Sequence, residues 1–178
     1  MVDLHEGIDS TLLILQNRIK ARYNRPEIEI VKEYSNLPPV ECWAGQLNQV
    51  FMNLLSNAID ALEDLPNRRG RITIRTSLNT DGSGVIIQIA DNGPGIHPEV
   101  KAQLFERFFT TKPLGKGTGL GLSISHQIIV EKHGGTLKCE SAPEQGTEFQ
   151  IEIPLQSSNC LSANASEAVT VTYSGCDF

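Results

Sequence analysis

Residues 71–95 read RITIRTSLNTDGSGVIIQIADNGPG and contain two β-rich runs, 71–78 and 85–90. The positions between the runs, 79–84, carry Asn, Thr, Asp, Gly, Ser and Gly, all of which favour turns. The pattern therefore predicts a β-hairpin. Strands joined in this way are antiparallel and need no crossover helix, which argues against a fold that alternates single strands with helices.

The segments on either side of the hairpin supply more strands and a set of helices. Apolar spacing and alternation predict helices over 4–20, 46–62, 98–105 and 120–132, and strands over 28–33, 136–141 and 147–153. The last two strands form a second hairpin. Strands that pair mainly as hairpins, with helices gathered elsewhere, indicate an α+β two-layer α/β sandwich.

Composition places the chain among ordinary soluble proteins. Of its 178 residues, 39% are hydrophobic and 20% charged, and the net charge of −6 offers no basic field for nucleic acid. No apolar run reaches the roughly 18–20 residues that a membrane span needs, and we expect no signal peptide. We expect a cytoplasmic chain with reduced cysteines and no membrane contact. We also expect one domain over 1–155 and a weakly ordered tail over 156–178, where Ser, Asn, Ala and Thr dominate.

Residues 110–121, TTKPLGKGTGLG, form a segment that we call the glycine loop. A Walker-type phosphate loop would require a glycine at position 110 and a serine or threonine at position 117, but these positions hold Thr110 and Gly117. A dinucleotide fingerprint would require a glycine at position 124, which holds Ile124, and a strand directly before the loop, which the pattern does not predict. Both common glycine-rich nucleotide motifs are therefore excluded.

The glycine loop nevertheless leads directly into a predicted helix. Unpaired backbone N–H groups and the helix dipole favour an anion at such an end, and Lys112 and Lys116 could add positive charge. A mobile surface loop would have the same composition, so both interpretations stay open on this segment alone.

The helix predicted over 46–62 carries a polar stripe opposite its apolar face, made up of Gln46, Asn53, Asn57, Asp60 and Asp64. A solvated face is one explanation, but solvated faces usually carry Lys, Glu and Arg, because asparagine is a poor helix former. Two asparagines one turn apart offer amide oxygens that suit a hydrated Mg²⁺ carrying phosphates.

The segment Asp-Asn-Gly-Pro-Gly, residues 91–95, ends the second strand of the first hairpin. A carboxylate at Asp91 could accept a hydrogen bond from an exocyclic amine such as that of adenine. An ordinary Asx turn is the alternative for this segment taken alone.

In their order along the chain, these segments resemble the catalytic ATP-binding domain of sensor histidine kinases, a branch of the Bergerat-fold ATPases that include gyrase, Hsp90 and MutL. The motifs are NLLSNAIDAL (53–62), DNGPG (91–95), FERFF (105–109), GKGTGLGL (115–122) and GTEF (146–149). The resemblance covers about 4–155. It implies a mixed, mostly antiparallel sheet with helices on one face.

The resemblance also implies roles for the motif residues. Asn57 is expected to ligate Mg²⁺, with Asn53 beside it as a second catalytic residue. Asp91 is expected to bind the adenine amine, in a loop to which Gly93 and Gly95 give room.

Further residues are implied around the nucleotide. The resemblance implies an aromatic box that anchors a lid over ATP, formed by Phe105, Phe108 and Phe109. It also implies that the lid glycines Gly117, Gly119 and Gly121 lie over the phosphates. Thr147 supports the adenine-side aspartate. The remaining expected nucleotide-binding residues are Asp60, Ile96, Thr110, Thr111, Thr118, Leu120 and Leu122, together with Lys112 and Lys116, whose positive charge is our reason for including them.

The expected function is to bind Mg-ATP and donate its γ-phosphoryl group to a histidine on a separate helical acceptor domain, and indirectly to a response regulator. A gyrase-type ATPase would carry a glutamate at Asn53 as general base, and an amide cannot take a proton. An ATP-binding switch module or an anti-sigma-type serine kinase is the alternative. His5 lacks the Arg and Pro that usually follow an acceptor histidine, so the chain is expected to be the catalytic half of a larger kinase, and a monomer when isolated.

Overall fold

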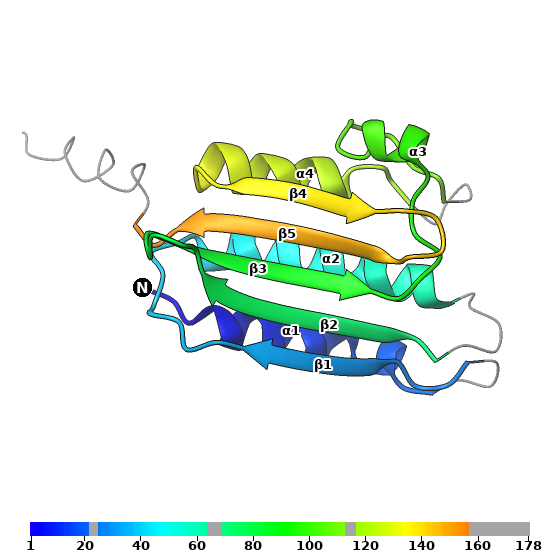
Figure 1. The fold of residues 1–178 in the computed structure, drawn as a ribbon, viewed down its shortest axis with the longest axis horizontal. Coiled ribbons are helices and arrows are strands. Elements are labelled where there is room, and N and C mark those ends of the chain that lie inside the picture. The colour runs from blue at the N-terminus through cyan, green and yellow to red at the C-terminus, as the bar shows by residue number, and fades with distance from the viewer. Residues whose placement is uncertain (22–24, 64–68, 113–116, 157–178) are drawn as a thin grey trace, which may run out of the picture.

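The structure is a computed structural model that describes residues 1–21, 25–63, 69–112 and 117–156 (Figure 1). The tail predicted over 156–178 lies almost wholly outside the described residues, as do Asp64 of the predicted polar stripe, Lys116, Cys160 and Cys176. Among the described helices, none combines the length and the apolar character that crossing a bilayer requires.

A five-stranded sheet forms one layer, with the strands in the order β1-β2-β3-β5-β4. These strands are β1 (Glu29–Tyr34), β2 (Arg71–Leu78), β3 (Gly84–Asp91), β4 (Thr136–Ser141) and β5 (Thr147–Pro154). β1 runs parallel to β2, and the other neighbouring pairs are antiparallel. The two predicted hairpins are β2–β3 and β4–β5.

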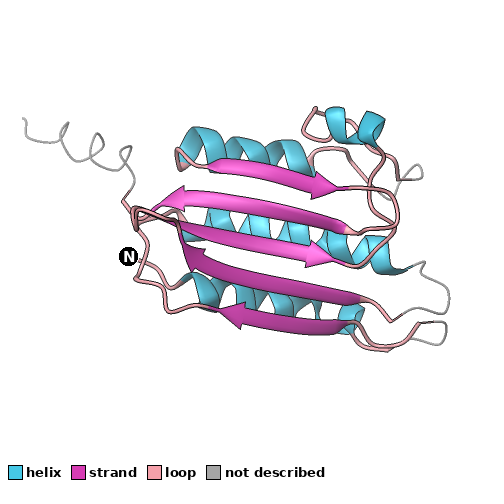
Figure 2. Ribbon diagram, in the orientation of Figure 1, coloured by secondary structure: helices cyan, strands magenta, loops and turns pink. Residues whose placement is uncertain are grey.

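Helices form the second layer, behind the sheet in the view of Figures 1 and 2. They are α1 (Leu4–Ile19), α2 (Ala44–Glu63) and α4 (Gly121–Gln127), which continues as a π-helical turn, η1 (Ile128–Lys132). The short α3 (Pro98–Ala102) lies beyond the end of β4 (Figure 1). The predicted α+β sandwich, with a mixed, mostly antiparallel sheet and helices on one face, is confirmed.

Alternation along the strands explains why the helices pack on only one face. In β3, the side chains of Val85, Ile87 and Ile89 are at most 1% exposed and belong to the core. On the opposite face, Arg71 pairs with Glu29 at 3.0 Å between Nε and Oε2, across the β1–β2 register. Burial of the apolar face favours the two-layer arrangement, and the polar face stays in water.

All four predicted helices differ from the structure in at least one bound. The helix predicted over 4–20 ends at Ile19, and the helix predicted over 46–62 runs from Ala44 to Glu63. The helix predicted over 98–105 ends at Ala102, because Gln103 leaves the helical region with φ −108° and ψ 6°. The helix predicted over 120–132 begins at Gly121 and widens into η1, where the N–H of His133 donates to the carbonyl of Ile128 at 3.2 Å. A bond that spans five residues in this way is the mark of a π turn.

His133, directly after η1, ties this turn to the start of α2. The side chain is 2% exposed, and its Nε2 accepts the backbone N–H of Trp43 at 3.1 Å. Nε2 is therefore unprotonated, and Nδ1 carries the proton that it donates to the carbonyl of Ile128 at 2.9 Å. One buried neutral imidazole thus fixes η1 against α2.

We expect His133→Leu to lower the free energy of unfolding by about 2 kcal/mol, because it removes both side-chain hydrogen bonds and leaves the Trp43 N–H without its acceptor. Chemical denaturation at neutral pH measures the change. His97→Leu, at an exposed position before α3, is the matched control and should cost less than about 0.5 kcal/mol. Equal losses in the two variants would contradict the role assigned to His133.

Candidate active site

A cavity of about 600 Å³ opens between α2, the end of β3 and the segments on either side of α3. Most of the residues predicted from the sequence line it: Asn53, Asn57, Asp60, Asp91, Gly95, Ile96, Phe109, Thr110, Thr111, Lys112, Gly117, Thr118, Gly119, Gly121, Leu122 and Thr147. Segments far apart in the sequence therefore meet at one site.

Two described residues from the prediction do not line the cavity. Gly93 lies behind Asp91 and donates its N–H to Oδ1 of that carboxylate at 2.8 Å. Leu120 is the N-cap of α4, and its carbonyl accepts the Ile124 N–H at 2.9 Å. Lys116 lies outside the described residues, so its predicted role stays a prediction.

Sequence reasoning missed several lining residues, most of them apolar: Ser56, Ala58, Ala61, Pro94, Val100, Leu104 and Phe149. Only their size offered a signal. Ala61 lies one helical turn after Asn57, where a small side chain leaves space beside the polar stripe. Val100, Leu104 and Phe149 carry no chemical mark that distinguishes them from core residues.

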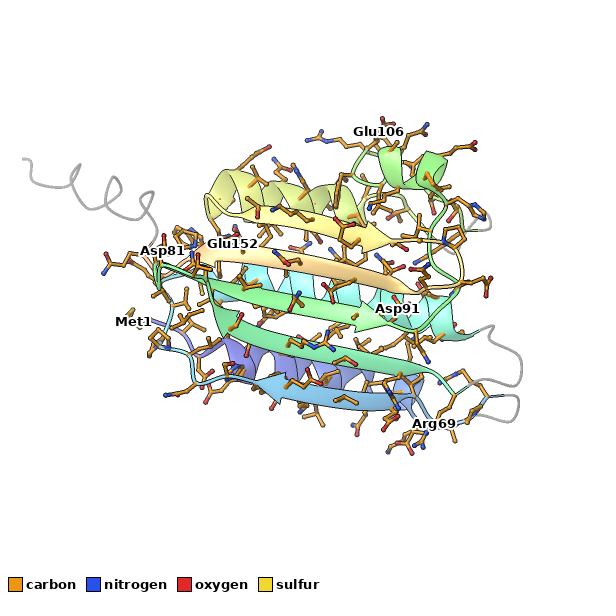
Figure 3. The ribbon with its side chains drawn as sticks, in the orientation of Figure 1. Met1, Arg69, Asp81, Asp91, Glu106 and Glu152 are labelled. Carbon is orange, nitrogen blue, oxygen red and sulfur yellow. The ribbon has the colours of Figure 1, made fainter. Side chains whose placement is uncertain are left out.

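Asp91 sits at the C-terminal end of β3, opposite Thr147 of β5 (Figure 3). Burial raises the pKa of the Asp91 carboxyl to about 6, although the backbone N–H groups of Gly93 and Thr147 donate to it and act in the opposite direction. A desolvated carboxylate with remaining acceptor capacity is suited to bind a polar N–H group of a ligand.

Gly146 allows the backbone to pack closely against Asp91. It has φ +81°, and a Cβ there would lie 2.1 Å from the carbonyl oxygen of Asp91. Gly95 has φ +74°, and its Cβ would lie 2.0 Å from the carbonyl oxygen of Ala142. Backbone therefore packs on backbone around Asp91, and a larger residue at either glycine would displace the loop.

The cavity also contains a group of charged and amide side chains. The ammonium of Lys112 donates to Oδ1 of Asn57 at 2.9 Å and to Oδ2 of Asp60. The other oxygen of Asp60 accepts from Arg18 of α1. Burial alone would raise the pKa of Asp60, but the hydrogen bonds from Lys112 and Arg18 outweigh it and lower that pKa below its ordinary value.

Asn53 connects α2 to α4. Its Nδ2 donates to the carbonyl of Gly121 at 3.0 Å and to Oγ of Ser125 at 3.1 Å, and Ser125 is fully buried. Both amide hydrogens are therefore used to hold the first turn of α4 beside the cavity. This contact is structural, and the catalytic role predicted for Asn53 stays a prediction.

The three phenylalanines expected to form the aromatic box do not pack together in this structure, and their role toward a lid stays a prediction. Phe105 packs its ring on His126 with centroids 5.2 Å apart, Phe109 lines the cavity, and Phe108 is 73% exposed. Phe108 also has φ +66°, in the left-handed region that non-glycine residues rarely occupy. Its N–H donates to the carbonyl of Gly119 at 2.9 Å, so the backbone, rather than an aromatic cluster, closes the base of the glycine loop.

Comparison with known proteins identifies the family. Residues 44–157 match the family described as histidine kinase-, DNA gyrase B-, and HSP90-like ATPase. The chain belongs to this family. The matched segment runs from the start of α2 past the end of β5 and therefore contains most of the cavity.

Sensor kinases are among the relatives of this chain. CckA of Brucella abortus is 37% identical over 164 residues, which is 84% of this chain and 17% of that protein. AtoS of Escherichia coli, a signal transduction histidine-protein kinase, is 35% identical over 86% of this chain and 24% of its own length. The chain thus spans about a fifth of the length of these relatives.

Solved histidine kinase structures share the fold. The nucleotide-free catalytic domain of ThkA is 33% identical with a TM-score of 0.72, and the match covers 87% of this chain and 96% of that one. Full-length ShkA in complex with AMPPNP has the same TM-score at 29% identity, over 88% of this chain and 31% of ShkA. The resemblance inferred from the motifs is therefore confirmed.

We expect Asp91→Asn to stabilise the ligand-free protein at pH 7.5. The folded-state pKa of about 6 lies above the ordinary value of 3.8, so the buried charge opposes folding above pH 6, by roughly 3 kcal/mol for two pKa units. This penalty disappears as the pH falls from about 6 to about 4, because the folded protein retains its proton. Thermal unfolding at pH 7.5 and pH 4.5 should therefore show a gain in Tm that shrinks in acid.

The control for this measurement is Asp81→Asn, in the exposed turn between β2 and β3. The pKa of Asp81 is lowered, chiefly by hydrogen bonds from Ser83, so its substitution should give no gain in Tm at pH 7.5. A lower Tm for Asp91→Asn than for the unchanged protein at pH 7.5 would contradict the burial argument.

Proposed function

We propose that this domain binds Mg-ATP and transfers its γ-phosphoryl group to a histidine on a separate helical domain of a larger two-component kinase. The observation that carries the proposal is the asymmetry of the cavity. The partly buried Asp91 carboxylate is held at one strand end, and the Asn57 amide of α2 forms a separate group with the Lys112 ammonium of the glycine loop. This division matches a ligand with an amine-bearing base and a polyanionic chain.

The Asp91 end suits adenine. An ionised carboxylate accepts hydrogen bonds only, and the exocyclic amine of adenine is a donor. Ile96, Val100 and Leu104 supply apolar lining, against which an aromatic base can lose its contact with water. We infer that Asp91 selects adenine over bases that present an acceptor at the same position.

The Asn57 end suits magnesium and phosphates. Mg²⁺ prefers oxygen ligands, keeps several waters and is commonly shared between few protein groups and the substrate phosphates. Asn57 lines the cavity, and its Oδ1 is an oxygen of the kind that Mg²⁺ prefers; in this structure it accepts a hydrogen bond from Lys112. When bound, Mg²⁺ would neutralise charge on the phosphates.

The residues of this chain favour transfer over hydrolysis. Hydrolysis would require a group that takes a proton from water, and Asn53 donates both of its amide hydrogens to α4 instead. A neutral imidazole needs no such base: its nitrogen forms the bond to the γ-phosphorus while the bond to the β-phosphate oxygen breaks, and ADP leaves.

The acceptor histidine is expected on another domain. His5 stacks on Tyr34 with ring centroids 4.2 Å apart and bonds to Thr76 through Nε2 at 2.9 Å. Along α1, it is thirteen positions from Arg18, or about 20 Å at the helical rise. Arg18 contacts the cavity residue Asp60, so His5 lies at the far end of that helix. The complex of ThkA with its response regulator TrrA supports a response regulator as the next partner.

The proposal predicts an acid-labile label on histidine when the parent kinase's helical acceptor domain, supplied as a separate polypeptide, is incubated with this protein and [γ-³²P]ATP. Asn57→Ala should reduce labelling at least about tenfold, because it removes the proposed magnesium ligand. Asn48→Ala, at an exposed position on the same helix, is the matched control and should label normally.

Two outcomes would contradict the proposal. Acid-stable phosphoserine on a partner would indicate the serine kinase alternative. Release of inorganic phosphate at the same rate with and without the acceptor domain would indicate an ATPase.

A further inference from the structure

Arg18 reaches the cavity group from outside the segment that the family comparison matches. It lies in the last turn of α1, whereas the match begins at residue 44. Its guanidinium donates to Oδ1 of Asp60 and, at 2.9 Å, to Oε1 of Glu63, both on α2. The Arg18 side chain is 30% exposed, so these bonds are only partly screened by water.

The end of α1 is itself held in place. The buried guanidinium of Arg25 donates to the backbone carbonyl of Arg18 and to that of Lys20 at 3.3 Å. These carbonyls belong to the helix terminus, where backbone acceptors lack partners within the helix. Arg18 therefore projects toward Asp60 from a fixed backbone.

Asp60 lies between two cations and is not placed to bind phosphate. One carboxylate oxygen accepts from Arg18 and the other from Lys112. The carboxyl is 29% exposed and stays ionised, because both cations favour its charged form. A carboxylate beside a triphosphate would repel it, so the contribution of Asp60 must come through the groups that it holds.

Lys112 is the group that Asp60 holds in the cavity. Its ammonium has three donors, of which one goes to Asp60 and one to Asn57 at 2.9 Å. The Asn57 oxygen is also the proposed magnesium ligand. Lys112 must therefore give up that one bond when Mg-ATP binds, and it can keep its bond to Asp60.

We propose that Arg18 and Asp60 are positioning residues for the triphosphate: Asp60 holds the Lys112 ammonium beside Asn57, and Arg18 neutralises the charge that Asp60 would otherwise present to the phosphates. This inference rests on the proposed function. It assigns Asp60 to the support of Lys112, where the motif alone had placed it among the nucleotide ligands.

The test compares ligands with and without phosphates. Arg18→Gln should weaken ATP binding about three- to fivefold, the upper part of the range for a partly exposed ion pair, because Asp60 is left with one cation. Binding of adenosine should change less than about twofold, since adenosine lacks phosphates. Calorimetry with ATP and Mg²⁺, and separately with adenosine, measures both affinities.

Four further variants make the test specific, and the first is Asp60→Asn alone, which the double-variant comparison requires. Asp60→Asn in the Arg18→Gln background should restore part of the ATP affinity, because it removes the uncompensated charge. Arg18→Lys should retain most of the affinity. Arg75→Gln is the matched control: it removes an ion pair with Glu33, 2.6 Å between Nε and Oε2 on the open face of the sheet, and should leave both affinities unchanged.

The outcomes separate this inference from the proposed function. If the unchanged protein binds ATP but Arg18→Gln binds it equally well, or loses ATP and adenosine affinity in the same proportion, the positioning role is wrong and the proposed function stands. If the unchanged protein does not bind ATP, both are wrong. Losses for Arg18→Gln and Asp60→Asn that simply add in the double variant would also overturn the inference.

Discussion

The burial of one carboxylate determines how the rest of the site is arranged. Asp91 can occupy the end of β3 only because β5 lies alongside and because Gly146 allows the backbone to approach its carbonyl oxygen. Taking the carboxylate out of water raises its pKa to about 6, at a cost to the stability of the empty protein. A ligand that donates a hydrogen bond to Asp91 would recover part of that cost. Desolvation of the carboxylate therefore favours ligand binding but lowers the stability of the ligand-free protein.

At the other end of the cavity, around Asp60, the proposed ligand requires positive charge. The proposed triphosphate needs cations, but unpaired cations beside the proposed Mg²⁺ would repel the metal. Asp60 contacts both Lys112 and Arg18. In the proposed complex, this pairing would keep their positive charge near the phosphates without leaving either cation unpaired. The two ends of the cavity therefore differ in charge pairing: among the residues that the structure describes, no cationic side chain pairs with Asp91, whereas Asp60 pairs with two.

Local sequence patterns predicted most of the fold and one class of site residue. The hairpin over 71–90 and the polar stripe with Asn53 and Asn57 depend on near neighbours, and both were visible in the sequence. Arg18 was not predicted, because its partner Asp60 is 42 positions away and nothing in α1 marks the contact. The left-handed backbone of Phe108 was missed as well, since such a conformation at a non-glycine residue has no signature in composition.

The most direct test of the central claim is to compare the binding of ATP and inosine triphosphate by calorimetry at pH 8 in the presence of Mg²⁺. The two ligands share the triphosphate, but inosine presents a carbonyl oxygen where adenine presents its amine, and Asp91 is ionised at this pH. Our account predicts that ATP binds at least about a hundredfold more tightly, because two acceptors would face each other in the inosine complex. Equal affinities would contradict the assignment of Asp91 and, with it, the orientation of the nucleotide in the cavity.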